Sequence, residues 1–488
     1  MLFNSLEFLI FFPVVTCLYF LLPQKYRWFL LLSASCLFYM AFIPVYILIL
    51  AVTIMIDYIA GMAIEASPSQ KRKKIFLVVS VVSTCLVLGV FKYFNFFNQN
   101  FAEIARFFHL NYPVGIVNII LPIGLSFHTF QSLSYVIEVY RGRQKAEKNF
   151  GIYALYVMFY PQLVAGPIER PQNLLHQFYE KHEFDYRRVT DGLKLMAWGM
   201  FKKVVIADRL SIVVNHVYGN PGDFSGVSLV IATVFFAFQI YSDFSGYSDI
   251  AIGAAQVMGF KLMDNFNRPY FSKSISEFWK RWHISLSSWF KDYLYISLGG
   301  NRVSPARRQF NLFFTFLVSG FWHGANWTFV IWGALNGFYL IFSIWTEKLR
   351  DRVAAFTGLA RHPRLQKYWK VFVTFGLVCF AWIFFRAANL SDAFYIITHL
   401  ADGWGRIFSV AGFNSVISGL GVSRTELLIG VLSIVFLECV HLVQRHGRIR
   451  HMLSSRPAWF RWIIYLAVIW GILAFGVFGK NQFIYFQF

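Results

Sequence analysis

Long apolar stretches constrain the fold of this chain more than any other feature. Because 57% of the 488 residues are hydrophobic and only 14% are charged, a soluble fold could not bury this apolar surface. A helix needs roughly 20 apolar residues to cross a bilayer. The apolar runs lie at 5–22, 28–43, 45–61, 75–97, 117–137, 151–165, 192–214, 227–259, 310–322, 327–346, 369–386, 425–443 and 461–479. They predict an all-α polytopic membrane protein, a single domain over residues 1–488 with about 11 to 13 membrane segments, some of them re-entrant.

The net charge is strongly basic, and the cations gather in loops. Lys+Arg number 45 against 24 Asp+Glu, a formal net charge of +21. No soluble domain carries these cations, so we expect them to meet anionic headgroups of a phospholipid membrane, with no nucleic acid partner. The basic loops are 24–27, 68–74, 140–148, 261–308, 347–352, 361–370 and 444–456. Placing them in the cytoplasm puts both termini outside.

The first run lacks the features of a signal peptide. It has no basic leader and no small-x-small cleavage site, and it carries Glu7, so we expect a retained first span. The five cysteines lie in apolar runs without CxxC spacing. We expect buried small hydrophobic residues, neither disulfide-bonded nor metal ligands, and we predict no metal site.

Ionisable residues inside apolar runs are candidates for function, because a charge at the centre of a membrane helix costs about 2.5–3.5 kcal/mol. They are Asp57, Glu138, Asp243, Asp249, His128 and His323. Lys92 and Arg386 lie near the ends of runs, where a long side chain reaches the interface.

His323 lies in the stretch SGFWHGANWTFVIWGALNG, residues 319–337. A helix over 310–322 would extend only about 20 Å, too short for a hydrocarbon core of about 30 Å. Both flanks are basic, so we expect a hairpin that turns back inside the membrane near WHGAN, with His323 at the inner end of a cavity. His323 is then either a structural histidine at a helix end or a general base.

A second histidine lies in SEFWKRWHISLSSWFKDYLYISLGGNR, residues 276–302. On a helical wheel one face carries apolar residues and His283, and the other carries charged residues. The apolar face comprises Trp279, Trp282, His283, Leu286, Trp289, Phe290 and Tyr293. The pattern predicts an amphipathic helix at the cytoplasmic interface. An interfacial anchor alone leaves His283 on the apolar face unexplained.

Two further stretches are open to two interpretations each. QIYSDFSGYSDIAIG, residues 239–253, places Asp243 and Asp249 among small residues, which fits either close helix packing or a polar substrate path. YPQLVAGPIERPQ, residues 160–172, contains three prolines, which fits either a broken, cavity-lining element or an interfacial loop.

Several motifs together resemble the membrane-bound O-acyltransferases, and most closely their bacterial polysaccharide-acetylating branch. They are the continuous stretch from residue 239 to 302, the stretch 319–337, LPIGLSFHTFQSLSYVIEVYRG (121–142), FYPQLVAGPIERP (159–171) and FIYFQF (483–488). The resemblance covers nearly the whole chain. In one place the chain departs from the branch: relatives often have GALHG where this chain has GALNG. Asn336 therefore cannot transfer a proton at that position.

The resemblance implies a fold and a site. The expected fold is a ring of transmembrane and re-entrant helices around a central funnel or tunnel in a bacterial inner membrane. His323 corresponds to the family's active-site histidine, and His283 to its second characteristic polar position. We expect the remaining candidates to line the substrate tunnel, namely Asn326, Trp322, Asp243, Ser242, Trp279 and Asn336.

The implied reaction is transfer of acetyl from cytoplasmic acetyl-CoA to an exported polysaccharide or cell-wall glycan, directly or through a periplasmic or extracellular acetyltransferase partner. His323 would take the proton of the acceptor hydroxyl. His283 or the Asn326 amide would orient the thioester or stabilise the oxyanion. Cations in the basic loop would meet the CoA phosphates, chiefly Arg281 and Arg302, with Arg268, Lys280, Arg307 and Arg308 as further candidates. No metal or tightly bound cofactor is expected.

Two other functions remain open at this point. A transporter of a polar solute or glycan would also use broken helices and buried acids, but it gives no reason for the pair His323 and His283. A D-alanyl transferase that takes its donor from a carrier-protein thioester is the nearer alternative. The WHGANW text favours the acetyl branch.

Overall fold

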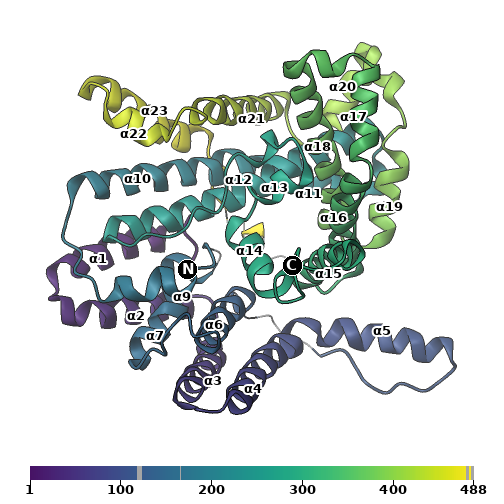
Figure 1. The fold of residues 1–488 in the computed structure, drawn as a ribbon. Helices are drawn as coiled ribbons and strands as arrows, with labels where there is room; N and C mark the ends of the chain where they lie inside the picture. Colours follow the sequence, from purple (N-terminus) through teal and green to yellow (C-terminus); the bar gives the residue numbers. More distant parts are fainter. Residues whose placement is uncertain (118–121, 123, 165, 480–482, 485–488) are drawn as a thin grey trace. The chain divides into compact units, whose positions relative to one another are not determined.

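A computed structural model describes residues 1–117, 122, 124–164, 166–479 and 483–484, and within these ranges the chain forms helices and no strand (Figure 1). The predicted all-α class is confirmed. The chain divides into two compact units, Met1–Met196 with Ser248–Met263 and Ala197–Tyr247 with Asp264–Phe488. The single domain predicted from the sequence stays a prediction, as does the arrangement of the helices around a funnel.

The first unit contains the N-terminal helices. They are α1 (Leu6–Leu21), α2 (Gln24–Met40), α3 (Tyr46–Ala66), α4 (Gln70–Leu88), a π-helix (Gly89–Tyr93), α5 (Phe94–Phe107), α6 (Leu125–Tyr140), α7 (Phe150–Met158), α8 (Tyr160–Leu163), α9 (Pro171–Leu174), a 3-10 helix (Leu175–Phe178) and most of α10 (Tyr186–Phe201). Helices α3, α4 and α6 pack against one another. The buried Asp57 carboxylate joins α3 to α4, since it accepts hydrogen bonds from Ser80 (2.5 Å) and Thr84 (3.2 Å).

The second unit carries both candidate histidines. Its elements are a π-helix (Lys202–Ala207), α11 (Asp208–Gly219), most of α12 (Val227–Met258), α13 (Ile275–Trp279), α14 (Ile284–Trp289), a π-helix (Phe290–Tyr295), α15 (Pro305–His323), α16 (Trp327–Trp345), α17 (Glu347–Phe356), α18 (Pro363–Arg386), α19 (Leu390–His399), α20 (Val410–Ser418), α21 (Arg424–Gln444), α22 (Ile449–Ser454) and α23 (Ala458–Phe475). Short 3-10 helices lie at Pro221–Asp223, Pro269–Phe271, Leu359–Arg361 and Trp404–Phe408.

Within the described residues, seven helices are long and apolar enough to cross a membrane. They are Tyr46–Ala66, Gln70–Phe107, Val227–Met258, Trp327–Trp345, Pro363–Arg386, Arg424–Gln444 and Ala458–Phe475. Helix α23 has no buried residue although it is apolar. An apolar surface of this size needs a cover, which lipid provides. The chain is therefore a membrane protein, while the predicted 11 to 13 segments stay a prediction.

The predicted hairpin around His323 is present, but its first arm is longer than the apolar run indicated. Helix α15 begins at Pro305, because the Ser304 hydroxyl accepts the Arg307 N–H at 3.4 Å and proline suits the first helical turn. Its 19 residues extend about 28 Å. The added residues are basic, and α15 is not among the helices that are long and apolar enough to cross a membrane, so the re-entrant hairpin and the depth of its turn stay predictions.

The segment 276–302 is not one amphipathic helix. It is divided into α13, α14 and a π-helix, and the break falls at His283, whose φ of 43° lies in the left-handed region. Nevertheless most of the predicted apolar face is buried: Trp282, His283, Leu286, Trp289, Phe290 and Tyr293. The prediction of which residues are buried was therefore largely correct, but the prediction that they share one continuous helix was wrong.

Other predictions from the apolar runs also need correction. The run 151–165 is divided into the shorter helices α7 and α8 beside Pro161, which has no N–H to continue a helix. The run 192–214 is helical throughout, with α10, the π-helix Lys202–Ala207 and α11 following one another without a gap. Of the five cysteines, only Cys379 is buried, while Cys17, Cys85 and Cys439 are exposed. These three lie on helix faces that no other part of the protein covers.

Candidate active site

His323 is the last residue of α15, and a three-residue turn separates it from α16. Asn326 caps α16, because its side-chain oxygen accepts the Thr328 N–H at 3.0 Å. The Asn326 amide nitrogen also donates to the Ala388 carbonyl at 3.1 Å. The turn is thereby attached both to α16 and to the residues that follow α18, which fixes the position of the histidine next to it.

Two glycines allow the arms of the hairpin to pack closely. A Cβ atom added to Gly320 would lie 2.4 Å from the Phe329 carbonyl oxygen, and one added to Gly333 would lie 2.4 Å from the Phe316 carbonyl oxygen. Both contacts are with backbone, which has little room to move. Helices α15 and α16 therefore need small residues here, and their close approach brings aromatic residues of α16 to His323.

The imidazole of His323 lies among aromatic rings and is 6% exposed. Its centroid is 4.9 Å from those of Trp322 and Trp332 and 5.5 Å from that of Phe385. All three rings meet the imidazole at steep angles, between 65° and 88°. Such apolar walls exclude water from the histidine and strengthen any charge interaction that it makes.

His283 is completely buried and belongs to a polar cluster. The oxygen of the Asn265 amide accepts the Ser285 N–H at 3.2 Å and the Ser285 hydroxyl at 2.9 Å. The same oxygen lies 3.0 Å from Nδ1 of His283. Because this oxygen is an acceptor, Nδ1 carries the proton and donates to it. Burial lowers the pKa of His283 to about 3, so the ring is neutral near pH 7.

This tautomer decides what His283 can do. With the proton on Nδ1, Nε2 presents a lone pair and accepts hydrogen bonds. An oxyanion needs a hydrogen-bond donor. The predicted oxyanion role therefore does not fit His283 in this state. Its Nε2 can instead accept a hydrogen bond from an N–H of the substrate and so orient the substrate.

An aromatic cluster connects the surroundings of the two histidines. Trp282, next to His283, packs on Trp382 with centroids 5.1 Å apart. Trp382 stacks on Trp332 at 5.9 Å, and Trp332 contacts His323. Trp279 joins the same cluster, 5.7 Å from Trp332. We refer to Trp279, Trp282, Trp332, Trp382 and Phe385 as the tryptophan cluster.

Asn336 supports this cluster. Its side-chain oxygen accepts the indole N–H of Trp279 at 3.2 Å, and its amide nitrogen donates to the Trp332 carbonyl at 2.8 Å. Trp279, Trp322 and Asn336 are thus brought together with His323 as predicted site residues. That they line a tunnel stays a prediction.

Asp243 belongs to a buried ion-pair cluster. It forms an ion pair with Lys203 at 2.7 Å, and Lys203 also binds Asp208 at 2.9 Å. The Asp243 carboxylate further accepts the Ile484 N–H at 2.7 Å. The three side chains are buried, which fits the packing interpretation, and the place of Asp243 in a substrate tunnel stays a prediction.

Asp249 and Ser242 lie on the same helix as Asp243, α12. Asp249 is half-buried. The Ser242 hydroxyl is buried and has no hydrogen-bond partner in the described part of the chain. Ser242 stays a predicted substrate contact.

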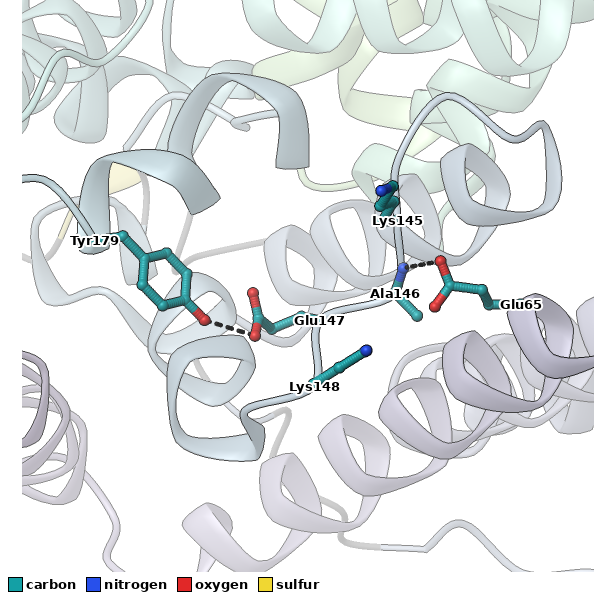
Figure 2. Close-up of a pocket in the computed structure, with 6 residues that line it drawn as sticks. All are labelled: Glu65, Lys145, Ala146, Glu147, Lys148 and Tyr179. Atoms are coloured by element: carbon teal, nitrogen blue, oxygen red, sulfur yellow. Dashed lines mark hydrogen bonds between the residues drawn. The ribbon is translucent and has the colours of Figure 1, made fainter.

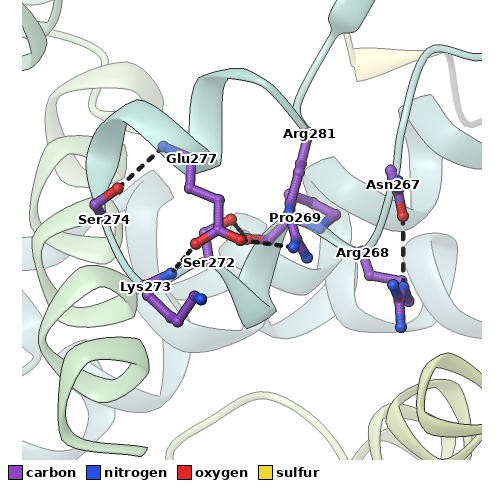
Figure 3. A network of polar contacts seen from close by, with 8 residues as sticks. All are labelled: Asn267, Arg268, Pro269, Ser272, Lys273, Ser274, Glu277 and Arg281. Carbon is purple, nitrogen blue, oxygen red and sulfur yellow. Dashed lines mark hydrogen bonds and ion pairs between the residues drawn. The ribbon is translucent and has the colours of Figure 1, made fainter. Parts of the chain in front are cut away.

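The predicted phosphate-binding cations Arg281 and Arg302 have different surroundings. Arg281 pairs with Glu277 at 2.6 Å, and Arg302 is exposed in the loop before α15. Figure 3 shows Arg281 together with Asn267 and Arg268, whose side chains hydrogen bond to each other at 3.4 Å.

Two polar regions of the first unit lie outside this site. In the segment 160–172, α8 ends at Leu163 and α9 begins at Pro171, which fits both predicted interpretations, a broken cavity-lining element and an interfacial loop. The buried Glu169 between the two helices accepts the Met263 N–H at 2.5 Å. A pocket lies beside the loop that precedes α7, where Glu147 accepts the Tyr179 hydroxyl at 2.7 Å (Figure 2). It is lined by Glu65, Lys145, Ala146, Glu147, Lys148 and Tyr179 and contains none of the predicted site residues.

Several functional neighbours were not predicted from the sequence. Asn265, Ser285, Trp382 and Phe385 gave no periodic signal, because they meet the histidines through irregular backbone or from distant helices. Lys203 could have been found, since Lys202 and Lys203 stand side by side in the apolar run 192–214. Leu121, Ile123, Ala165 and residues 485–488 of the quoted motifs lie outside the described residues. Among the residues that are described, no group of three or more metal-ligating side chains occurs.

Comparison with known proteins identifies the family and several relatives of this chain. Residues 52–388, which include both histidines, match the membrane-bound O-acyltransferase family. The chain is similar to the probable alginate O-acetylase of Pseudomonas aeruginosa, with 42% identity over 80% of this chain and 73% of the relative. It is also similar to the peptidoglycan O-acetyltransferase of Helicobacter pylori, with 35% identity over 75% of this chain and 72% of the relative. Similarity to the teichoic acid D-alanyltransferase of Streptococcus thermophilus is lower, with 28% identity over 56% of this chain and 70% of the relative.

Proposed function

Because the chain belongs to the membrane-bound O-acyltransferase family, we propose that it uses cytoplasmic acetyl-CoA to O-acetylate an exported polysaccharide or cell-wall glycan. The acetyl group crosses a bacterial inner membrane and reaches the glycan directly or through a periplasmic or extracellular acetyltransferase partner. The observation that carries the proposal is His323 at the end of α15, buried among the rings of Trp322, Trp332 and Phe385.

In the proposed reaction His323 acts as general base. The acceptor hydroxyl gives its proton to the imidazole while its oxygen attacks the thioester carbonyl carbon. The C–S bond then breaks, the thiolate of CoA leaves, and the imidazolium returns the proton to that sulfur. The amide nitrogen of Asn326 has a second N–H besides the one bound to Ala388, and this N–H is the candidate donor to the oxyanion.

His283 has a positioning role in this scheme. Its Nε2 accepts an N–H of the donor, such as an amide in the arm that carries the thioester, while Asn265 holds the ring through Nδ1. The tryptophan cluster connects this position to His323. Asn336, where relatives often have histidine, holds Trp279 and takes no part in proton transfer.

The relatives support acetyl as the transferred group. The proteins named as O-acetylating enzymes are 35–42% identical to this chain, compared with 28% for the D-alanyl transferase. A transporter gives no reason for a histidine enclosed by aromatic rings. We also infer the orientation from the basic loops, with these loops in the cytoplasm and both termini outside.

Donor identity is the most direct test of this function. Purified protein in lipid vesicles would be supplied first with radiolabelled acetyl-CoA and then with a D-alanyl carrier-protein thioester, together with a soluble glycan or partner acceptor. We expect the protein to consume the thioester and transfer the acyl group only when the donor is acetyl-CoA. Transfer from the carrier protein alone would assign the chain to the D-alanyl alternative, and solute uptake without thioester cleavage would indicate a transporter.

A further inference from the structure

Asp57 is a buried carboxylate that the proposed reaction does not use. It lies near the middle of α3, one of the helices long and apolar enough to cross a membrane, and its side chain is completely buried. In the described part of the chain no lysine or arginine forms an ion pair with it. An ionised carboxylate inside a membrane helix is costly unless a counter-charge accompanies it. The described residues do not supply that counter-charge.

The nearest partners of Asp57 are hydroxyl groups of the neighbouring helix α4. The Ser80 hydroxyl donates to Oδ1 of Asp57 at 2.5 Å. The Thr84 hydroxyl lies 3.2 Å from Oδ1 and 3.3 Å from Oδ2. Ser80 and Thr84 are one helical turn apart and both are buried. One face of α4 therefore places two hydroxyl oxygens against one carboxylate.

Two further hydroxyl groups come from α6 and α7. Ser132 of α6 also lies beside the Asp57 carboxylate. The Tyr153 hydroxyl of α7 lies beside Ser132, yet it is buried and no group of the described residues is placed to hydrogen bond to it. Helices α3, α4 and α6 pack side by side, and α7 packs on α3 and α6 (Figure 1). Oxygen atoms of four helices thus surround one buried charge.

Carboxylate and hydroxyl oxygens are the ligands that hard cations prefer. A hydroxyl group that donates its proton to a carboxylate still has lone pairs for a metal ion. Oxygens that share one small ion at about 2.3–2.6 Å lie about 3–3.5 Å from each other, and Thr84 has this spacing from both carboxylate oxygens. A monovalent ion would leave a site with a single carboxylate neutral, whereas a divalent ion would leave a buried positive charge.

We propose that the oxygens around Asp57 bind a sodium ion. The ligands are Asp57, Ser80, Thr84, Ser132 and Tyr153. The ion supplies the counter-charge that the chain lacks here and joins α3, α4, α6 and α7 of the first unit. Sodium is favoured over potassium, because oxygens as close together as those of Asp57 and Thr84 suit a small ion. This site lies within the first unit and does not depend on the proposed function.

Equilibrium binding of radioactive Na⁺ tests the site directly. Full-length protein in nanodiscs of neutral lipid would be titrated in choline chloride as wild type, Asp57→Asn, Thr84→Val and Ser83→Ala. Ser83→Ala is the matched control, because the Ser83 hydroxyl lies on the same helix and bonds only to backbone carbonyls of α4. We expect wild type and the control to bind one ion per chain. Thr84→Val, which loses one oxygen ligand, should bind about tenfold more weakly, and Asp57→Asn should not bind.

Three results of this titration would overturn the proposal. The first is the absence of saturable Na⁺ binding by the wild type, which would mean that Asp57 is held as a neutral carboxylic acid. The second is binding that Asp57→Asn retains, which would place the ion elsewhere in the protein. The third is displacement of Na⁺ by an equal or lower concentration of K⁺, which would contradict a site for a small ion.

Thermal unfolding gives a second measurement, which does not require Asp57→Asn to fold. An ion that binds only the folded protein stabilises it by mass action, so the Tm of the wild type should rise more with NaCl than with choline chloride. Thr84→Val should need about tenfold more Na⁺ for the same rise, and Ser83→Ala and His323→Ala should respond as wild type does. Equal rises with both salts would show a general salt effect and contradict the site.

Discussion

His283 and His323 are both buried, yet the residues beside them give them different chemistry. His283 has a fixed partner in Asn265, which keeps the proton on Nδ1. His323 lies at the end of α15 among aromatic rings, beside the turn that Asn326 caps. In the proposed scheme His283 is therefore the positioning histidine and His323 the base.

Acid should therefore destabilise the protein through His283. Its pKa in the folded protein, about 3, lies below the ordinary value of 6.5. Between these values the unfolded chain binds a proton that the folded chain does not, so stability falls as the pH drops below 6.5. By pH 5 this loss amounts to about 2 kcal/mol. Thermal unfolding in detergent at pH 7.5 and pH 5 should show a smaller drop in Tm for His283→Gln than for wild type, and equal drops would contradict the assignment.

At the scale of elements, the hairpin of α15 and α16 forms the frame of the site. Its turn was predicted from glycine, alanine and asparagine beside an apolar run, and these residues do form the turn. The length of α15 was not predicted, because its first turn contains basic residues, which lie outside the apolar run. The contact of His283 with Asn265 could not be predicted from sequence patterns either. The backbone between the two residues is largely irregular, and irregular backbone gives no periodic pattern of apolar residues.

Close packing of the hairpin predicts a large effect from a single methyl group. Gly333→Ala would bring Cβ to 2.4 Å from the Phe316 carbonyl oxygen and force the helices apart. We expect a loss of about 1–3 kcal/mol in stability, seen as a lower Tm, together with reduced transfer. Gly376→Ala on α18 is the matched control, because no atom lies within 4 Å of its added Cβ. A Gly333→Ala protein as stable as the control would show that the helices are not so closely packed.

At the scale of the whole molecule, the apolar runs and basic loops predicted a helical membrane protein, and this is what the structure and the family match show. The tryptophan cluster was not predictable in the same way. Its members come from α13, the turn after it, α16 and α18, and only the packing of these helices brings them together. Each tryptophan alone resembles any other buried aromatic residue.

Orientation in the membrane gives a prediction at this scale. On a background without native cysteines, Ser391→Cys lies in a region with few cations and Ser455→Cys in a basic loop, and both serines are exposed. We expect a membrane-impermeant maleimide added to spheroplasts to label position 391 directly and position 455 only after permeabilisation. The reverse pattern would invert the proposed orientation and place the basic loop 261–308 on the wrong side for a cytoplasmic donor.

The central claim is that His323 takes the proton of the acceptor hydroxyl. Acetyl transfer from labelled acetyl-CoA should be measured with equal amounts of vesicle-inserted wild type and His323→Ala, with Tm measured for both. The account predicts that His323→Ala folds and inserts but loses at least about 100-fold in rate, within the usual contribution of a general base. Transfer by this variant at a rate close to wild type would contradict the account.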